Sequence, residues 1–298
     1  MGGLFSKPSP PPPPPPTFDE PWRELSWGEN TRDLQYARDY QPQSGGVSHL
    51  RVMLYGPVGA GKSSFIDSVS NTLRGRMGME TMTGTDQSTK GQSLTKRYKT
   101  HRIKKDGRNG YYNFVFNDVM GIEDGTGRGV HVDDIKLAMQ GHVKDEYKFN
   151  PVSPLTSDDP GYNQSPSPDD KIHVLVCVYS ANASEITDSV LHKMRDIREA
   201  ACDLDIRQLL IVTKVDEACP ETQESLRNVY KSKHVKKKMA EFSSKVGIPM
   251  RFVLPVKNYS DEISIDPDAD TLILCVLRLI LDFGNDFLEQ CAQNTSTD

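Results

Sequence analysis

Short apolar runs alternate with longer stretches of helical periodicity along most of this chain. Six runs are rich in β-branched and aromatic residues and are short enough to be buried strands: residues 49–55, 94–103, 111–117, 172–179, 207–212 and 250–256. Between and after them, apolar residues recur every three or four positions, as in 64–73 and 272–287, which predicts helices that pack on a sheet. This alternation predicts an α/β fold: a mostly parallel six-stranded sheet with one antiparallel strand and helices on both faces.

The first apolar run leads directly into a phosphate-binding motif. Residues 56–63 read GPVGAGKS, which matches G-x-x-x-x-G-K-[ST] between a strand and a helix. Glycines let backbone N–H groups turn toward phosphate oxygens, and the helix N-terminus adds a positive field. Lys62 is expected to reach the β- and γ-phosphates, and Ser63 to bind Mg²⁺. The predicted phosphate-binding residues are Gly56, Pro57, Val58, Gly59, Ala60, Gly61, Lys62, Ser63 and Ser64.

Two later motifs indicate which nucleotide is bound. The run at 111–117 ends in Asp118-Val119-Met120-Gly121, a D-x-x-G element in which Asp118 would meet Mg²⁺ through water and the Gly121 N–H the γ-phosphate. The run at 207–212 ends in Thr213-Lys214-Val215-Asp216. A carboxylate at Asp216 can accept two hydrogen bonds from guanine, whereas adenine would leave it unsatisfied. These motifs predict a GTP/GDP site with Mg²⁺, and they disfavour a P-loop ATPase or kinase.

Other residues near the base are assigned by their position. The Lys214 stem can lie over the guanine ring. Thr213 stands where an Asn is typical, and we expect it to brace the P-loop less well. Lys257 and Asn258 follow the last predicted strand, where a short loop would present a backbone N–H to guanine O6.

The switch regions are less well marked. The residue that closes over Mg²⁺ should be a Thr just before the strand at 94–103; Thr95 is preferred, with Thr89 and Thr85 as alternatives. Ile122 follows Gly121, where Ras-like enzymes place a water-orienting Gln, and no catalytic residue can be assigned. We therefore expect GTP hydrolysis to be slow. The alternative is a nucleotide-binding scaffold without turnover.

Composition narrows the partners and the compartment. The net charge of −5 argues against nucleic acid as the main partner. Five Cys without a CxxC pair fit a reducing compartment, so a cytoplasmic location is expected. The longest apolar run, 272–281, is broken by Arg278 and is too short to span a bilayer. The helical pattern at 272–287 is expected to pack on the sheet, with a homodimer interface as the alternative.

The N-terminal residues differ from the rest. Gly2 and Ser6 satisfy the M-G-x-x-x-[ST] pattern for N-myristoylation, which would give weak and reversible membrane contact. Seven consecutive Pro at 10–16 predict a stiff spacer, or alternatively a ligand for SH3-type grooves. Five Lys between 231 and 238 are expected to form a solvated helix face, or alternatively a patch that joins the acyl chain at an anionic membrane.

These features predict the domain organisation. Residues 1–17 would be a disordered head, and 18–46 a docking segment with a helix from Pro21 and a Gly-rich hinge. The folded domain would span 47–289, and 290–298 would be a disordered tail.

In combination these motifs resemble the interferon-induced protein 44 and 44-like family. The matching stretches are FDEPWR at 18–23, GPVGAGKSS at 56–64, D-x-x-G at 118–121, GHV at 141–143, FNP at 149–151, TKVDEAC at 213–219 and VKNY at 256–259. The resemblance implies a P-loop GTPase G domain in an interferon-responsive, antiviral or immune-associated cytoplasmic protein. Longer family members carry a further domain before this region, where this chain has its Pro-rich head.

Overall fold

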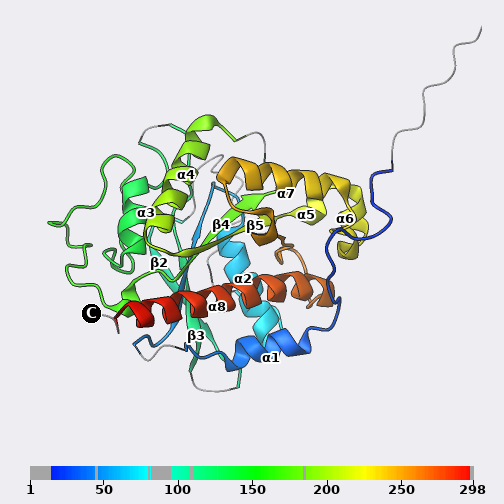
Figure 1. Cartoon of the computed structure of the whole chain (residues 1–298), viewed down its shortest axis with the longest axis horizontal. Helices are drawn as coiled ribbons and strands as arrows, with labels where there is room; N and C mark the ends of the chain where they lie inside the picture. Colours follow the sequence, from blue (N-terminus) through cyan, green and yellow to red (C-terminus); the bar gives the residue numbers. More distant parts are fainter. Residues whose placement is uncertain are drawn as a thin grey trace, which may run out of the picture.

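A six-stranded sheet forms the centre of the molecule in the computed structural model, which describes residues 15–43, 46–79, 81, 95–107, 110–125, 127–183 and 186–295 (Figure 1). Its strand order is β2-β3-β1-β4-β5-β6. All neighbouring strands are parallel except β2 and β3. The strands are β1 (Leu50–Tyr55), β2 (Lys99–Lys104), β3 (Tyr111–Asp118), β4 (Val174–Ser180), β5 (Arg207–Thr213) and β6 (Val253–Pro255).

Helices cover both faces of the sheet. One layer contains α1 (Thr31–Asp39), α2 (Lys62–Arg74) and α8 (Pro267–Thr295), and the other contains α3 (Val132–Met139), α4 (Asp188–Asp203) and α7 (Lys233–Val246) (Figure 1). The short helices α5 (Val215–Ala218) and α6 (Pro220–Glu224) follow β5. No helix in the described ranges is long and apolar enough to cross a membrane. The predicted mostly parallel six-stranded sheet with helices on both faces is confirmed.

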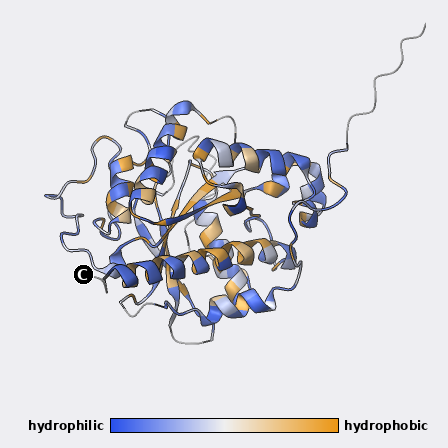
Figure 2. Cartoon of the chain, in the orientation of Figure 1, coloured by the Kyte–Doolittle hydropathy of each residue, from blue (hydrophilic) through white to orange (hydrophobic). Residues whose placement is uncertain are grey.

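The two helical layers explain why the central strands are apolar on both sides. Every residue of β1 and of β4 is buried, as expected for strands covered on both faces. Hydrophobic residues concentrate on the central strands, while the helices turn hydrophilic residues outward (Figure 2). Because β1, β3, β4 and β5 are parallel, their carboxyl ends meet at one edge of the sheet, where ligands of open α/β sheets bind.

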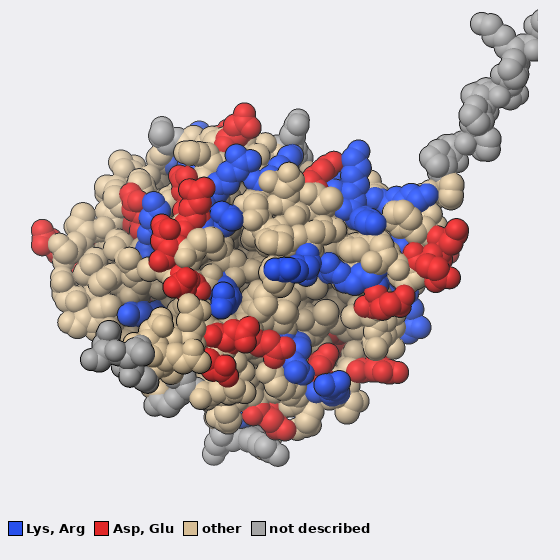
Figure 3. Space-filling model, in the orientation of Figure 1, with Lys and Arg blue, Asp and Glu red and all other residues tan. Residues whose placement is uncertain are grey.

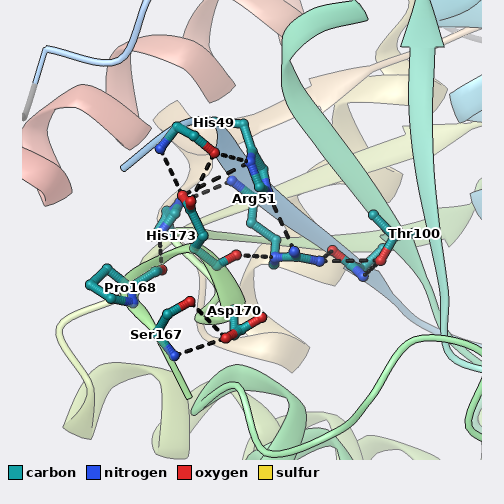
Figure 4. A network of polar contacts seen from close by, with 10 residues as sticks. His49, Arg51, Thr100, Ser167, Pro168, Asp170 and His173 are labelled. Carbon is teal, nitrogen blue, oxygen red and sulfur yellow. Dashed lines mark hydrogen bonds and ion pairs between the residues drawn. The ribbon is translucent and has the colours of Figure 1, made fainter. Parts of the chain in front are cut away.

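Arg51 is a charged residue within the buried strand β1, and a network of polar contacts satisfies its hydrogen-bonding groups (Figure 4). Its guanidinium donates to Asp169 O at 2.8 Å and to Asn117 Oδ1 at 3.1 Å. Its backbone N–H donates to His173 Nδ1 at 2.9 Å, and His173 Nε2 lies 3.1 Å from Pro168 O. His173 is therefore the neutral tautomer with its proton on Nε2, and burial lowers its pKa to about 4. The network lies at the amino ends of β1 and β4, away from the P-loop.

Several predicted boundaries were wrong. The helix expected from Pro21 begins only at Thr31, because the intervening chain follows the surface of the core: the Trp22 N–H donates to Tyr230 O at 3.0 Å. The tail expected from residue 290 is helical, since α8 continues to Thr295. The last strand is limited to Val253–Pro255, because a 3₁₀ turn (Met250–Phe252) takes the place of its predicted first residues.

Candidate nucleotide-binding site

The P-loop, residues 56–63, connects the carboxyl end of β1 to the start of α2. Gly56 has φ +148°, and a Cβ there would lie 2.1 Å from Val178 O on β4, so no other residue fits. Gly61 has φ +89° and forms the N-cap of α2. These two glycines let the loop turn back over the end of the sheet, with the N-terminus of α2 behind it.

The D-x-x-G segment is joined to the P-loop. The Ile122 N–H donates to Gly56 O at 3.0 Å, and the Val58 N–H lies 3.4 Å from Ile122 O. A Cβ on Gly121 would lie 2.5 Å from Val58 Cγ2. The D-x-x-G segment and the P-loop are therefore in direct contact, and only glycine fits at position 121.

Lys62 is almost completely buried beneath the loop. Its Nζ donates to Gly56 O and to Pro57 O, both at 3.1 Å. Burial lowers the pKa of this ammonium group, and the charge of Asp118 opposes that effect. Two carbonyl oxygens compensate only part of the cost of burying a cation. The position is therefore suited to an anionic ligand that would complete the neutralisation.

The three residues predicted to hold Mg²⁺ lie together. Ser63 Oγ donates to Asp118 Oδ2, and Thr95 Oγ1 donates to the same oxygen at 3.1 Å. The other carboxylate oxygen, Asp118 Oδ1, is buried and has no hydrogen-bond partner among the described residues. An unsatisfied buried carboxylate oxygen beside two hydroxyls is a donor set that fits Mg²⁺. Thr85 and Thr89, the alternatives to Thr95, lie outside the described residues.

Thr213 contacts the P-loop directly, although an Asn is typical at this position. Thr213 Oγ1 donates to Ala60 O at 2.7 Å, and Asn258 Nδ2 donates to the next carbonyl, Gly61 O, at 3.0 Å. Two side chains from two different strand ends therefore share the bracing. The sequence predicts a role near guanine only for the backbone at Asn258, and no motif indicates the contact that its side chain makes with Gly61.

Asp216 and Lys214 lie at the carboxyl end of β5, as predicted. Lys214 has φ +56°, a strained conformation that is common at functional sites. Burial raises the pKa of Asp216, and the positive charge of Lys257 opposes that effect. Lys257 Nζ forms an ion pair with Glu262 at 2.7 Å. Glu262 is a further residue that the motifs did not indicate.

Lys193 of α4 also contacts this region without any motif to mark it. Its Nζ donates to Glu123 O at 2.8 Å and to Gly125 O at 2.9 Å, which ties the segment after Gly121 to the helix. A cavity of about 360 Å³ lies alongside, lined by the outer P-loop residues, Lys214 and the β4–α4 connection.

The predicted lipidation residue Gly2 lies outside the described residues.

Together, the strand order, the P-loop after β1 and the motifs at the ends of β3 and β5 define the G-domain fold of P-loop GTPases. The chain is 35% identical over 262 residues to interferon-induced protein 44 of Mus musculus, which covers 88% of this chain and 61% of that protein. It is 34% identical over 260 residues to interferon-induced protein 44-like of Homo sapiens, covering 87% and 56% respectively. The chain is therefore a relative of the interferon-induced protein 44 and 44-like proteins, which confirms the resemblance.

This chain spans only 56 to 61% of the length of these relatives. No protein-family model matches it. Among solved structures, Toc33 from Arabidopsis thaliana in complex with GDP and Mg²⁺ is 13% identical with a TM-score of 0.46, over 80% of this chain and 86% of that one. Aquifex aeolicus Era bound to GDP·AlF4⁻ is 13% identical with a TM-score of 0.42, over 78% and 56%. At these values the fold assignment rests on the topology and the P-loop of the chain itself.

Proposed function

We propose that this protein binds GTP and GDP with Mg²⁺ at the P-loop site and acts as a nucleotide-dependent switch with slow GTP hydrolysis. The observation that carries the proposal is the meeting of Ser63, Thr95 and Asp118 beside the buried Lys62 ammonium. The buried Lys62 ammonium group favours binding of an anion, and the oxygen atoms of Ser63, Thr95 and Asp118 favour binding of a cation. A nucleotide phosphate chain with its Mg²⁺ supplies both at once.

The ion would be held by Ser63 and Asp118, with Thr95 closing over it. When bound, Mg²⁺ would neutralise charge on the phosphates. The protein's own residues would position the ligand. Backbone N–H groups of the P-loop would face the phosphates, and the Asp216 carboxylate would accept two hydrogen bonds from guanine.

Slow hydrolysis follows from what lies beside Gly121. Ile122 is buried and its backbone is bonded to Gly56, so this position offers no polar side chain to orient an attacking water. Val58 covers Gly121 from the P-loop side. We expect unassisted turnover no faster than about 10⁻⁴ s⁻¹, the scale of intrinsic Ras activity.

The same observation favours a second function, that of a scaffold that binds nucleotide and never turns it over. The two functions differ in one assay. Single-turnover reactions with γ-labelled GTP would show slow phosphate release for the switch. No release above the rate without protein, at full GTP occupancy, would assign the scaffold.

The binding proposal is tested by releasing nucleotide from the purified protein and identifying it by HPLC, followed by titration with a fluorescent GDP analogue. Guanine nucleotide should be recovered, and Lys62→Ala should lose affinity, while Lys136→Ala on the surface of α3 should bind as the wild type does. Equal affinity of the wild type and Lys62→Ala would refute the site.

The biological setting follows from the relatives rather than from the site. Because they are named interferon-induced, we propose that expression of this protein rises after interferon treatment, as part of an antiviral response. Transcript levels in treated and untreated cells of the source organism test this, and an unchanged level contradicts it.

A further inference from the structure

A basic surface lies at the start of α7, far in sequence from the P-loop. Residues 231–245 contain six Lys and a single acidic residue, in a chain whose net charge is −5. Lys231, just before α7, and Lys233, Lys236 and Lys237 within it lie at least partly exposed, and we call these four lysines the basic α7 face. Lys237 approaches Glu241 only at 4.0 Å, a contact that leaves its charge largely uncompensated. Figure 3 shows Lys and Arg side chains gathered over α7.

The first described residues of the chain lie on this face. The Lys233 N–H donates to Pro16 O at 3.0 Å, and Lys233 Nζ donates to Pro15 O at 2.8 Å. The Phe18 N–H donates to Lys231 O at 2.8 Å. Backbone and side-chain bonds thus fix Pro15 and Pro16 against the N-terminus of α7.

Aromatic rings are interleaved with these lysines. The ammonium groups of Lys233 and Lys236 lie 5.3 Å and 4.8 Å from the centre of the Phe18 ring, and Lys236 lies 5.3 Å from Trp22. Phe18 and Trp22 remain partly exposed. Lysines beside amphipathic aromatic rings are typical of surfaces that lie at the headgroup level of a bilayer.

The position of Pro15 limits where the N-terminus can act. Gly2 precedes Pro15 by thirteen residues, which span at most about 45 Å when fully extended. An acyl group on Gly2 would therefore always be tethered to the basic α7 face. A single acyl chain binds a membrane only marginally, so stable anchoring needs a second signal such as a polybasic patch.

We propose that the basic α7 face binds anionic membrane surfaces and that N-myristoylation of Gly2 supplies the second half of the anchor. Each lysine near an anionic leaflet strengthens binding about fivefold. The four lysines and one acyl chain together give an anchor that neither provides alone. The tether and the aromatic rings favour a lipid surface over a nucleic acid. The proposal is independent of nucleotide binding, because no residue of the P-loop site lies on α7.

The test is cosedimentation of the full-length chain, enzymatically myristoylated, with phosphatidylcholine vesicles containing 30% phosphatidylserine. The triple variant Lys233→Glu, Lys236→Glu and Lys237→Glu should lower the partition coefficient more than a hundredfold. Binding should also fall in 1 M salt, where the Debye length is about 3 Å. Gly2→Ala should bind the same vesicles weakly, and vesicles of phosphatidylcholine alone should retain little of the wild type.

The matched control replaces three exposed lysines elsewhere with Glu: Lys104, Lys148 and Lys171. This control should bind vesicles as the wild type does. Both triple variants should keep the wild-type circular dichroism and GDP affinity, which separates lost membrane contact from lost folding. Equal losses in both variants, or no loss in the α7 variant, would overturn the proposal. Failure of the enzyme to acylate Gly2 would overturn its acyl half. If the α7 triple variant lost binding to duplex RNA but bound vesicles as the wild type does, the face would be assigned to nucleic acid instead.

Discussion

Thr213→Val is expected to weaken both the fold and the nucleotide site. Thr213 is fully buried, and its Oγ1 donates to Ala60 O at 2.7 Å and lies 3.3 Å from Tyr179 O. Valine has nearly the same shape, so the substitution removes the hydrogen bond without opening a cavity. The Ala60 carbonyl then stays buried without a donor, which costs about 2 kcal/mol of unfolding free energy.

The loss should also reach the ligand. Ala60 precedes Gly61, whose carbonyl Asn258 holds, so one of the two braces that preorganise the P-loop disappears. We expect the dissociation constant for GDP to rise about tenfold, the equivalent of 1.4 kcal/mol. GDP at a hundred times the wild-type dissociation constant stabilises the wild type by about 2.7 kcal/mol. The same concentration should stabilise the variant by only about 1.4 kcal/mol.

Urea unfolding followed by tryptophan fluorescence, with and without GDP, measures both quantities. The matched control is Thr156→Val, because the Thr156 hydroxyl bonds Asp159 at 2.9 Å in an exposed loop. It should cost under about 1 kcal/mol and leave the stabilisation by GDP unchanged. Equal effects of the two substitutions would show that Thr213 does not brace the P-loop.

Three further outcomes are expected. Gly121→Ala should abolish binding of a fluorescent GDP analogue, because the added Cβ would lie 2.5 Å from Val58 Cγ2; wild-type affinity contradicts this. EDTA should speed GDP release, since Asp118 would face phosphate without a counter-ion, and unchanged release contradicts the Mg²⁺ site. The folded-state pKa of His173, about 4, lies below its unfolded value near 6.5, so its contribution to stability is lost as pH falls through that window. Between pH 7 and pH 5 the stability gap between wild type and His173→Asn should shrink by about 2 kcal/mol in urea titrations, whereas a constant gap refutes the assignment.

The parts of the site that follow directly from local sequence were predictable. The P-loop and the motifs that contain Asp118 and Asp216 each begin where an apolar strand ends, and parallel strands bring their carboxyl ends to one edge of the sheet. Thr95 was placed by its position before β2, and its hydroxyl lies against Asp118. The side-chain chemistry of these residues and their positions at strand ends are enough to predict that they form one site, without knowledge of their contacts.

Contacts between distant segments were not predictable. Asn258 bonds Gly61 across 197 residues of sequence, and Lys193 bonds Glu123 across 70. Neither pair carries a periodic or motif signal, because a side chain that holds a backbone carbonyl needs no particular sequence context. The helix predicted from Pro21 failed for a related reason: the contact of Trp22 with Tyr230 outweighs local helix propensity.

The proposed selection of guanine by Asp216 can be tested by measuring the nucleotide affinities of Asp216→Asn. An amide cannot accept both hydrogen bonds from guanine, but it can pair with the additional oxygen of xanthine. The variant should lose GDP affinity and gain affinity for xanthosine diphosphate, while Glu217→Gln on the next, exposed residue should keep the wild-type preference. Unchanged GDP affinity in Asp216→Asn would contradict the claim.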